Sequence, residues 1–257
     1  MKLYYDKSPC NGLANALPFY GDKEFQLPTR STLPLLSLIK DEQQMLSELF
    51  HSVGMSAEWT LHLEYKVNPP RGIGKASHTD LMVLSNTSSL AIEAKWTEPR
   101  YQTVGEWLRE GTNPSNRLDV FSGWLSLLQK HARRQLKTED FTDTVYQMVH
   151  RSASACAVAA DPRMAYLVFK SSLDPKTADF STIQDDIKHL WNLLGKPKSF
   201  PFYLIEMYLL PTSAFNAIVS MAKGNNSTAR QVSAALLGAD RLFRFKMHRL
   251  INVGESL

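Results

Sequence analysis

Apolar positions along the chain recur with helical and strand periods, and these periods divide it into a series of expected elements. Residues 33–53 carry apolar side chains at helical spacing, and Gly54 follows where a glycine commonly ends a helix. Residues 58–67 (EWTLHLEYKV) alternate between apolar and polar, as a half-buried strand does. Two more strands are expected near 80–85 and 89–96.

The rest of the chain alternates helices with strands, while the first 32 residues are expected to be irregular. Residues 102–137 are expected to be helical with an interruption at 111–114. The remaining expected elements are a helix at 141–159, a strand at 163–169, a helix at 179–194, a strand at 201–210, a helix from Thr212 and a last strand at 241–251. This order predicts an α/β fold with a mixed central sheet flanked by helices.

Composition places the chain among ordinary globular proteins and limits its environment. It has 257 residues, of which 44% are hydrophobic and 21% charged, and we expect one domain. Its two cysteines, Cys10 and Cys156, favour a reducing cytoplasm, and we expect neither a signal peptide nor a membrane span. The formal net charge of +4 permits nucleic-acid binding without requiring it.

Charged side chains lie inside two of the expected strands. Glu93 and Lys95 are two residues apart in LAIEAKW, so they share the face opposite Leu90, Ile92, Ala94 and Trp96. Asp80 begins the preceding strand, and a hairpin across 85–89 would set it near Glu93. This face is either solvated, with ion pairs between strands, or the covered wall of a site.

The first helix and the helix at 141–159 add further candidates. Glu42 falls in the middle of the first helix's apolar stripe, where a carboxylate is costly unless a polar group receives it. In the later helix Gln147 and Arg151 share one face, with His150 at its edge. That face lies either in water or against the charged strands.

This arrangement resembles the PD-(D/E)xK nuclease superfamily, the restriction-endonuclease-like fold. Asp80 matches the first acid and Glu93-Ala94-Lys95 the (D/E)xK, although Thr79 stands where many members have proline. The order helix, three strands, helix, strand matches residues 33–170, which we expect to form the catalytic core. Residues 171–257 are then an extension of the same domain.

The resemblance implies a metal-dependent nuclease that hydrolyses phosphodiester bonds, with DNA as the expected substrate. Asp80, Glu93 and the backbone carbonyl of Ala94 would bind Mg²⁺ or Mn²⁺, since oxygen ligands suit these ions. The metal would activate water, and Lys95 would offset charge that develops on the phosphate. Glu42 and Gln147 are further expected members of the catalytic site. A homodimer is a further expectation, because enzymes of this kind often dimerise to cut two strands.

Several basic residues are candidate contacts to nucleic acid. Arg71 and Lys75 lie in the glycine-containing loop that leads to Asp80, and we expect them, with His150 and Arg151, to contact the substrate. Arg117 is either a structural partner of a helix cap or a phosphate contact. The alternatives to a nuclease are a catalytically silent nucleic-acid-binding module and a protein-interaction module on the same fold. Walker A, HExxH and GxSxG motifs are absent from the sequence.

Overall fold

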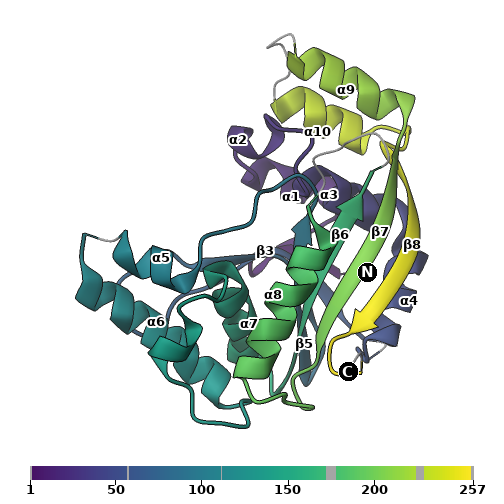
Figure 1. The fold of residues 1–257 in the computed structure, drawn as a ribbon. Coiled ribbons are helices and arrows are strands. Elements are labelled where there is room, and N and C mark those ends of the chain that lie inside the picture. The colour runs from purple at the N-terminus through teal and green to yellow at the C-terminus, as the bar shows by residue number, and fades with distance from the viewer. Residues whose placement is uncertain (1, 57, 111, 172–177, 224–228, 256–257) are drawn as a thin grey trace.

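The molecule is built on one sheet of eight strands in the order β2-β1-β3-β4-β5-β6-β7-β8 (Figure 1). The computed structural model describes residues 2–56, 58–110, 112–171, 178–223 and 229–255. The strands are β1 (Lys2–Tyr5), β2 (Ser8–Cys10), β3 (Thr60–Val67), β4 (Ser77–Leu84), β5 (Ser88–Lys95), β6 (Asp161–Lys170), β7 (Phe202–Pro211) and β8 (Phe243–Asn252).

The sheet is mixed, as the sequence predicts. Strands β3, β4 and β5 form an antiparallel meander, whereas β5, β6 and β7 run parallel to one another. The antiparallel strand β8 closes one edge, and β1 joins β3 in parallel at the other side. Helices connect the parallel strands, which is the usual way to return the chain to the same end of a sheet.

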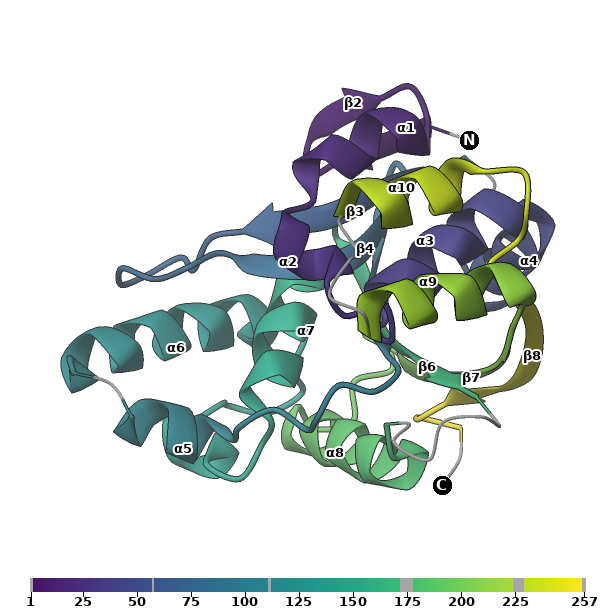
Figure 2. The ribbon, with the colours of Figure 1, turned by 90° about the horizontal axis from the view of Figure 1, so that it is seen from above.

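Helices cover both faces of the sheet (Figure 2). One face packs its apolar side chains with those of α3, α4, α9 and α10, and the other packs with α6, α7 and α8. The helices are α1 (Leu13–Ala16), α2 (Asp22–Phe25), α3 (Thr32–Asp41), α4 (Gln43–Ser52), α5 (Val104–Arg109), α6 (Pro114–Gln129), α7 (Tyr146–Val158), α8 (Phe180–Leu193), α9 (Ser213–Lys223) and α10 (Ala229–Leu237), with short 3-10 helices η1 (Leu17–Phe19) and η2 (Thr138–Phe141). None of these described helices is long and apolar enough to cross a membrane.

The alternation in β5 has the predicted phase. Ile92 and Ala94 lie in the core beneath α3, whereas Ala91 lies in the core on the opposite face. Glu93 and Lys95 therefore follow Ala91 onto the face covered by α7. They are only 2% and 7% exposed, so the solvated alternative is wrong for this face.

Two expectations about the N-terminal part are wrong. The helix expected at 33–53 is two helices, because Glu42 leaves the helical region at φ −129° and ψ 47° and separates α3 from α4. Gly54, with φ 78°, does end the second helix. The first 32 residues are not irregular throughout, because β1 pairs with β3 and short helices follow. Strands and helices this short carry too few periods to be recognised.

Candidate active site

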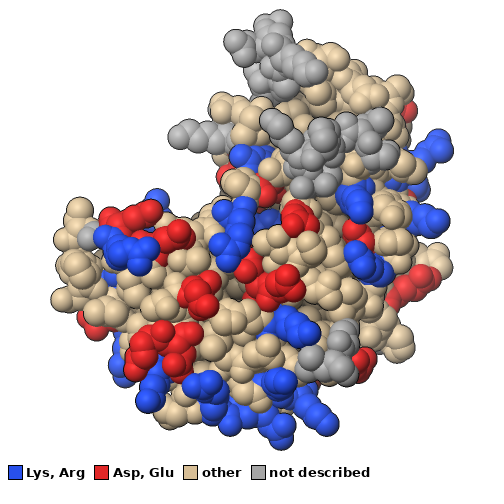
Figure 3. Space-filling view, viewed as in Figure 1, with Lys and Arg blue, Asp and Glu red and all other residues tan. Residues whose placement is uncertain are grey.

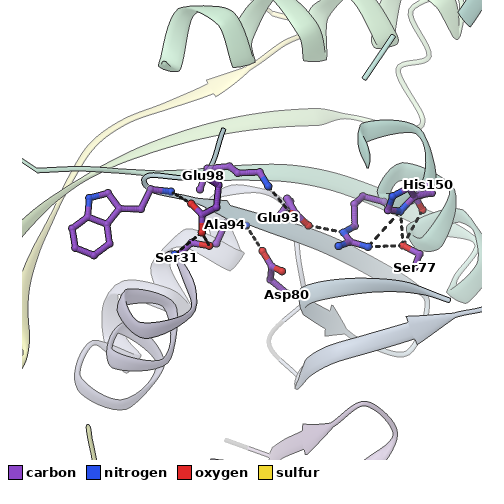
Figure 4. Close-up of polar contacts among 10 residues, drawn as sticks. Ser31, Ser77, Asp80, Glu93, Ala94, Glu98 and His150 are labelled. Carbon is purple, nitrogen blue, oxygen red and sulfur yellow. Dashed lines mark hydrogen bonds and ion pairs between the residues drawn. The ribbon is translucent and has the colours of Figure 1, made fainter. Parts of the chain in front are cut away.

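The end of the β4–β5 pairing positions Asp80 beside Glu93. The recorded ladder stops at Leu81 and Ile92, one residue before the two acids. Beyond it, the Asp80 Oδ2 atom accepts a hydrogen bond of 2.8 Å from the backbone N–H of Ala94 (Figure 4). The carboxylate thus takes the place of a backbone acceptor at the point where the strands separate.

Glu93 lies between two cations. Its Oε1 atom accepts a hydrogen bond of 2.9 Å from the Lys95 ammonium, and its Oε2 atom accepts one of 2.5 Å from Nε of Arg151. All three side chains are buried, with 8% exposure for Arg151. Arg151 comes from α7, the helix that covers this face, so of the two alternatives for this helix face the structure has the one in which Arg151 lies against the charged strands.

Burial and neighbouring charges shift the pKa values of Asp80 and Glu93 in opposite directions. Burial alone would raise the pKa of Glu93, but the charges and hydrogen bonds of Arg151 and Lys95 outweigh it and lower that pKa. Burial raises the pKa of Asp80 well above its usual value, and the charges of Glu93 and Glu64 add to the effect. The charges of Arg151 and Lys95 act on Asp80 in the opposite direction but do not outweigh burial, and no ion pair among the described residues includes Asp80.

Arg151 also connects the acids to a second polar group. Its Nη1 atom donates a hydrogen bond of 2.8 Å to Oγ of Ser77, and that hydroxyl lies 2.9 Å from Nδ1 of His150 (Figure 4). Burial and the charges of Arg151 and Lys95 hold the pKa of His150 well below its usual value. His150 is therefore neutral at physiological pH and supports Ser77 and Arg151 rather than carrying a charge to the substrate.

A cleft of about 470 Å³ opens over this group. Of the residues predicted for the site, those that line it are Asp80, Glu93, Ala94, Lys95, Gln147 and Arg151. Gln147 is 6% exposed and projects from α7 one helical turn before Arg151. The cleft therefore brings together side chains from β4, β5 and α7.

Glu64 on β3 lines the same cleft and escaped prediction. Its φ of 49° is left-handed, a conformation that costs a residue with a side chain about 1–3 kcal/mol. This residue breaks the alternation of β3, so that Leu63 and Tyr65 lie in opposite cores. Simple alternation along the sequence cannot reveal such a break, and the acid's place beside Asp80 follows from it.

Four predicted residues do not line the cleft, and one of them, His150, lies behind it against Ser77. Glu42 forms an ion pair of 2.7 Å with Arg241, so its expected place beside Asp80 is wrong. The helix break at Glu42 turns its side chain to the surface instead of keeping it in the apolar stripe. Arg71 packs its backbone against Gly123 of α6, and Lys75 lines a different cavity.

The oxygen donors around Asp80 fit a hard divalent cation, although they do not enclose one by themselves. Among the described residues, no group of three or more His, Cys, Asp or Glu side chains is close enough to hold a metal ion. Asp80 nevertheless forms no direct ion pair with a described residue, and Glu64 and Glu24 line its cleft. A strand residue directs its N–H and C=O to the same neighbouring strand, so the Ala94 carbonyl is on the β4 side of β5, the side of its N–H bond to Asp80.

Comparison with known proteins places the chain in one family. A family model described as a domain of unknown function, DUF6946, matches residues 9–201. The chain belongs to the DUF6946 family. The DUF6946 match includes every residue that lines the cleft and ends just before β7. Neither the search of curated proteins nor the search of solved structures found a match.

The charge on one face of this DUF6946 protein is mixed. Figure 3 shows Asp and Glu side chains interspersed with Lys and Arg over most of the view, and basic side chains gathered along its lower edge. No continuous basic surface covers the described part of this face. Any preference for a polyanion must therefore come from local groups rather than from one broad basic field.

Proposed function

We propose that this chain is a metal-dependent nuclease of the PD-(D/E)xK type that hydrolyses phosphodiester bonds, with DNA as the preferred substrate. The observation that carries the proposal is the Asp80 carboxylate, which has no direct ion pair among the described residues and lines an open cleft beside the Glu93–Lys95 pair. The Glu93–Lys95 ion pair would be stable without a second carboxylate beside it. A site for a metal cation, in contrast, needs a carboxylate that is not already paired with a lysine or an arginine.

Asp80, Glu93 and the Ala94 carbonyl would hold the ion. The two Glu93 oxygens already accept from Lys95 and Arg151, but a carboxylate has about four lone-pair sites and can accept more. Bound Mg²⁺ or Mn²⁺ would supply Lewis-acid stabilisation of charge on the phosphate.

The protein's own groups complete the chemistry. The Lys95 ammonium is fixed by Glu93 at one edge of the cleft, where it would stabilise charge that develops on the phosphate in the transition state. Arg151 holds Glu93 in place and is itself held by Ser77. Gln147 offers an amide at the wall of the cleft that can donate to a phosphate oxygen.

A second candidate function is a catalytically silent module that binds nucleic acid or protein. The observation that favours it is the occupation of both Glu93 oxygens by cations, which would make a purely structural triad. We favour the nuclease because such a triad would not explain Asp80. We further propose that the protein works in the cytoplasm, since Cys10 and Cys156 are free thiols, and that it acts as a homodimer if it cuts both strands of a duplex.

The test is an incubation of the purified protein with supercoiled plasmid, single-stranded DNA and RNA. Each substrate is combined with Mg²⁺, with Mn²⁺ and with excess EDTA. The nuclease proposal predicts cleavage that requires the metal and is strongest on DNA. Intact substrates in every metal, together with measurable binding of nucleic acid, would support the silent module instead.

A further inference from the structure

A second cavity, of about 400 Å³, lies on the other side of the wall formed by Ser77 and His150. Residues 73–76 of the loop before β4 and Ser77, the first residue of β4, line part of it. Residues of α5, α6 and α7 line the rest. Ser77 lines this cavity and bonds Arg151, which lines the catalytic cleft. The two hollows therefore share a wall only a few side chains thick.

One wall of this cavity carries an arginine, Arg117, that lies against a stack of aromatic rings. Tyr146 and Trp107 lie parallel, with ring centroids 3.9 Å apart and an interplanar angle of 12°. The Arg117 guanidinium lies 4.9 Å from the Trp107 centroid. Stacking of this kind fixes the plane of a guanidinium and therefore the directions of its N–H donors.

One nitrogen of the Arg117 guanidinium has no hydrogen-bond partner among the described residues. Its Nη1 atom is buried and has no hydrogen bond to any described residue. The ion pairs that the described arginines form involve Arg100, Arg134, Arg151, Arg163, Arg241 and Arg249, and not Arg117. A buried donor without an acceptor is costly, and a planar fork of donors matches phosphate oxygens. A phosphate oxygen is therefore a chemically suitable acceptor for this guanidinium.

The loop that carries Lys75 is fixed beside this arginine. Asn116, one residue before Arg117, accepts a hydrogen bond of 2.7 Å from the N–H of Ile73 and donates one of 2.8 Å to its carbonyl. Gly72 adopts a φ of 70° and packs so closely on Val120 that a Cβ atom would lie 2.7 Å from its methyl group. These contacts hold the segment that carries Lys75 at the wall of the cavity.

We propose that this cavity binds a second, non-scissile phosphate of the nucleic-acid strand, with Arg117 as the residue that receives it. The inference rests on the proposed nuclease function and narrows its substrate to a strand that continues beyond the scissile bond. Ser77 and Asp80 are three residues apart on β4, which is about 10 Å along the strand. A strand that enters the catalytic cleft is thus within a few nucleotides of Arg117.

The experiment measures how binding depends on salt, without cleavage. A fluorescein-labelled single-stranded oligodeoxynucleotide and its duplex are titrated with protein in EDTA over a series of KCl concentrations. Wild type is compared with Arg117→Met, Arg117→Lys and the control Arg244→Met. Arg244 is an exposed arginine on β8, four strands away from β4. Melting curves of each variant show that it is folded.

The logarithm of the binding constant falls as the logarithm of the salt concentration rises, and loss of one phosphate contact makes this slope less steep by about 0.7 for single strands and about 0.9 for a duplex. We expect this loss in Arg117→Met, a weaker affinity with an unchanged slope in Arg117→Lys, and wild-type behaviour in Arg244→Met. If Arg117→Met does not fold, an affinity for Arg117→Lys equal to that of wild type overturns the inference.

Two other outcomes also overturn it. One is a slope for Arg117→Met equal to that of wild type and Arg244→Met. The other is stabilisation by inorganic phosphate that depends on Arg117 while binding of the oligonucleotide does not, because the cavity would then serve a free anion. The nuclease proposal is tested independently of this inference. Cleavage of DNA by wild type in Mg²⁺ or Mn²⁺ would support it, and absence of cleavage would count against it, whatever the binding experiments show.

Discussion

Replacement of Asp80 by asparagine should stabilise the protein, and the gain should grow as the pH rises. Burial and the charge of Glu93 raise the pKa of Asp80 well above its usual value of 3.8, so the folded protein keeps this proton to a higher pH than the unfolded chain. Unfolding then releases a proton, and the free energy of unfolding falls with rising pH until the folded pKa is passed. The asparagine side chain keeps an acceptor for the Ala94 N–H and has no proton to release.

The size of the gain follows from the linkage of protons to folding. Each pH unit between the unfolded and the folded pKa of Asp80 costs wild type about 1.4 kcal/mol that Asp80→Asn does not lose. For a chain of this size, that corresponds to roughly 3–5 °C in melting temperature per pH unit. Near pH 4 the two proteins should melt within about 1 °C of each other, by the same conversion.

Thermal melts of both proteins in EDTA, from pH 4 to pH 8, measure this difference directly. Asp140→Asn is the matched control, because Asp140 forms a surface ion pair of 2.7 Å with Arg134 and lies outside the cleft. That control should cost about 0–1 kcal/mol with no gain at high pH. A difference between wild type and Asp80→Asn that is independent of pH, or a loss of stability throughout, would refute the reasoning.

Added Mn²⁺ extends the same experiment to the metal. An ion that binds only the folded state at 100 times its Kd stabilises wild type by about 2.7 kcal/mol. We expect this stabilisation to increase with pH, as the Asp80 proton is displaced, and to disappear in Asp80→Asn. Equal stabilisation of both proteins would place the ion elsewhere.

The remaining predictions concern the triad, the first helix and the core. Arg151→Met should lower the free energy of unfolding in urea by about 3–5 kcal/mol, because buried Glu93 then keeps only one of its two cations; a loss below 1 kcal/mol would show the pair to be weak. Glu42→Gln should leave cleavage unchanged and cost at most about 1 kcal/mol, since it loses only the surface pair with Arg241; a collapse of activity would return Glu42 to the site. Tyr166→Phe should not reduce the melting temperature, because the buried hydroxyl of Tyr166 has no described hydrogen-bond partner; a clear drop would reveal a hidden one.

The part of the site that the sequence predicted depends on short-range geometry. Alternation along one strand sets Glu93 and Lys95 on one face, and a tight hairpin brings Asp80 next to them. Both features depend on residues that are close in sequence, so they can be predicted without knowing how the rest of the chain packs. The helical face of Gln147 and Arg151 was also predictable, but its contact with Glu93, 58 residues away, required the packing of α7 on the sheet.

The errors come from places where the backbone leaves its regular conformation. The phase of a helix is lost at a break, and for this reason Glu42 was assigned to the wrong side. The alternation of a strand is lost at a left-handed residue, and for this reason Glu64 was overlooked. Neither residue is a glycine or asparagine, the types that usually signal such conformations, so long-range packing and ion pairs must impose them.

The most direct test of the central claim is the rate at which wild type and Lys95→Ala cleave DNA in a single turnover with Mn²⁺. Lys170→Ala is the matched control, because Lys170 also ends a strand and pairs with a buried acid, Glu206, at 3.5 Å. Circular dichroism and melting curves confirm that the proteins compared are folded.

Lys95→Ala should reduce the rate by about 10²–10³ while binding of DNA changes little, because the ammonium acts on charge present only in the transition state. Lys95→Arg should restore part of the rate, and Lys170→Ala should cut like wild type. Cleavage by Lys95→Ala at the wild-type rate would contradict the account.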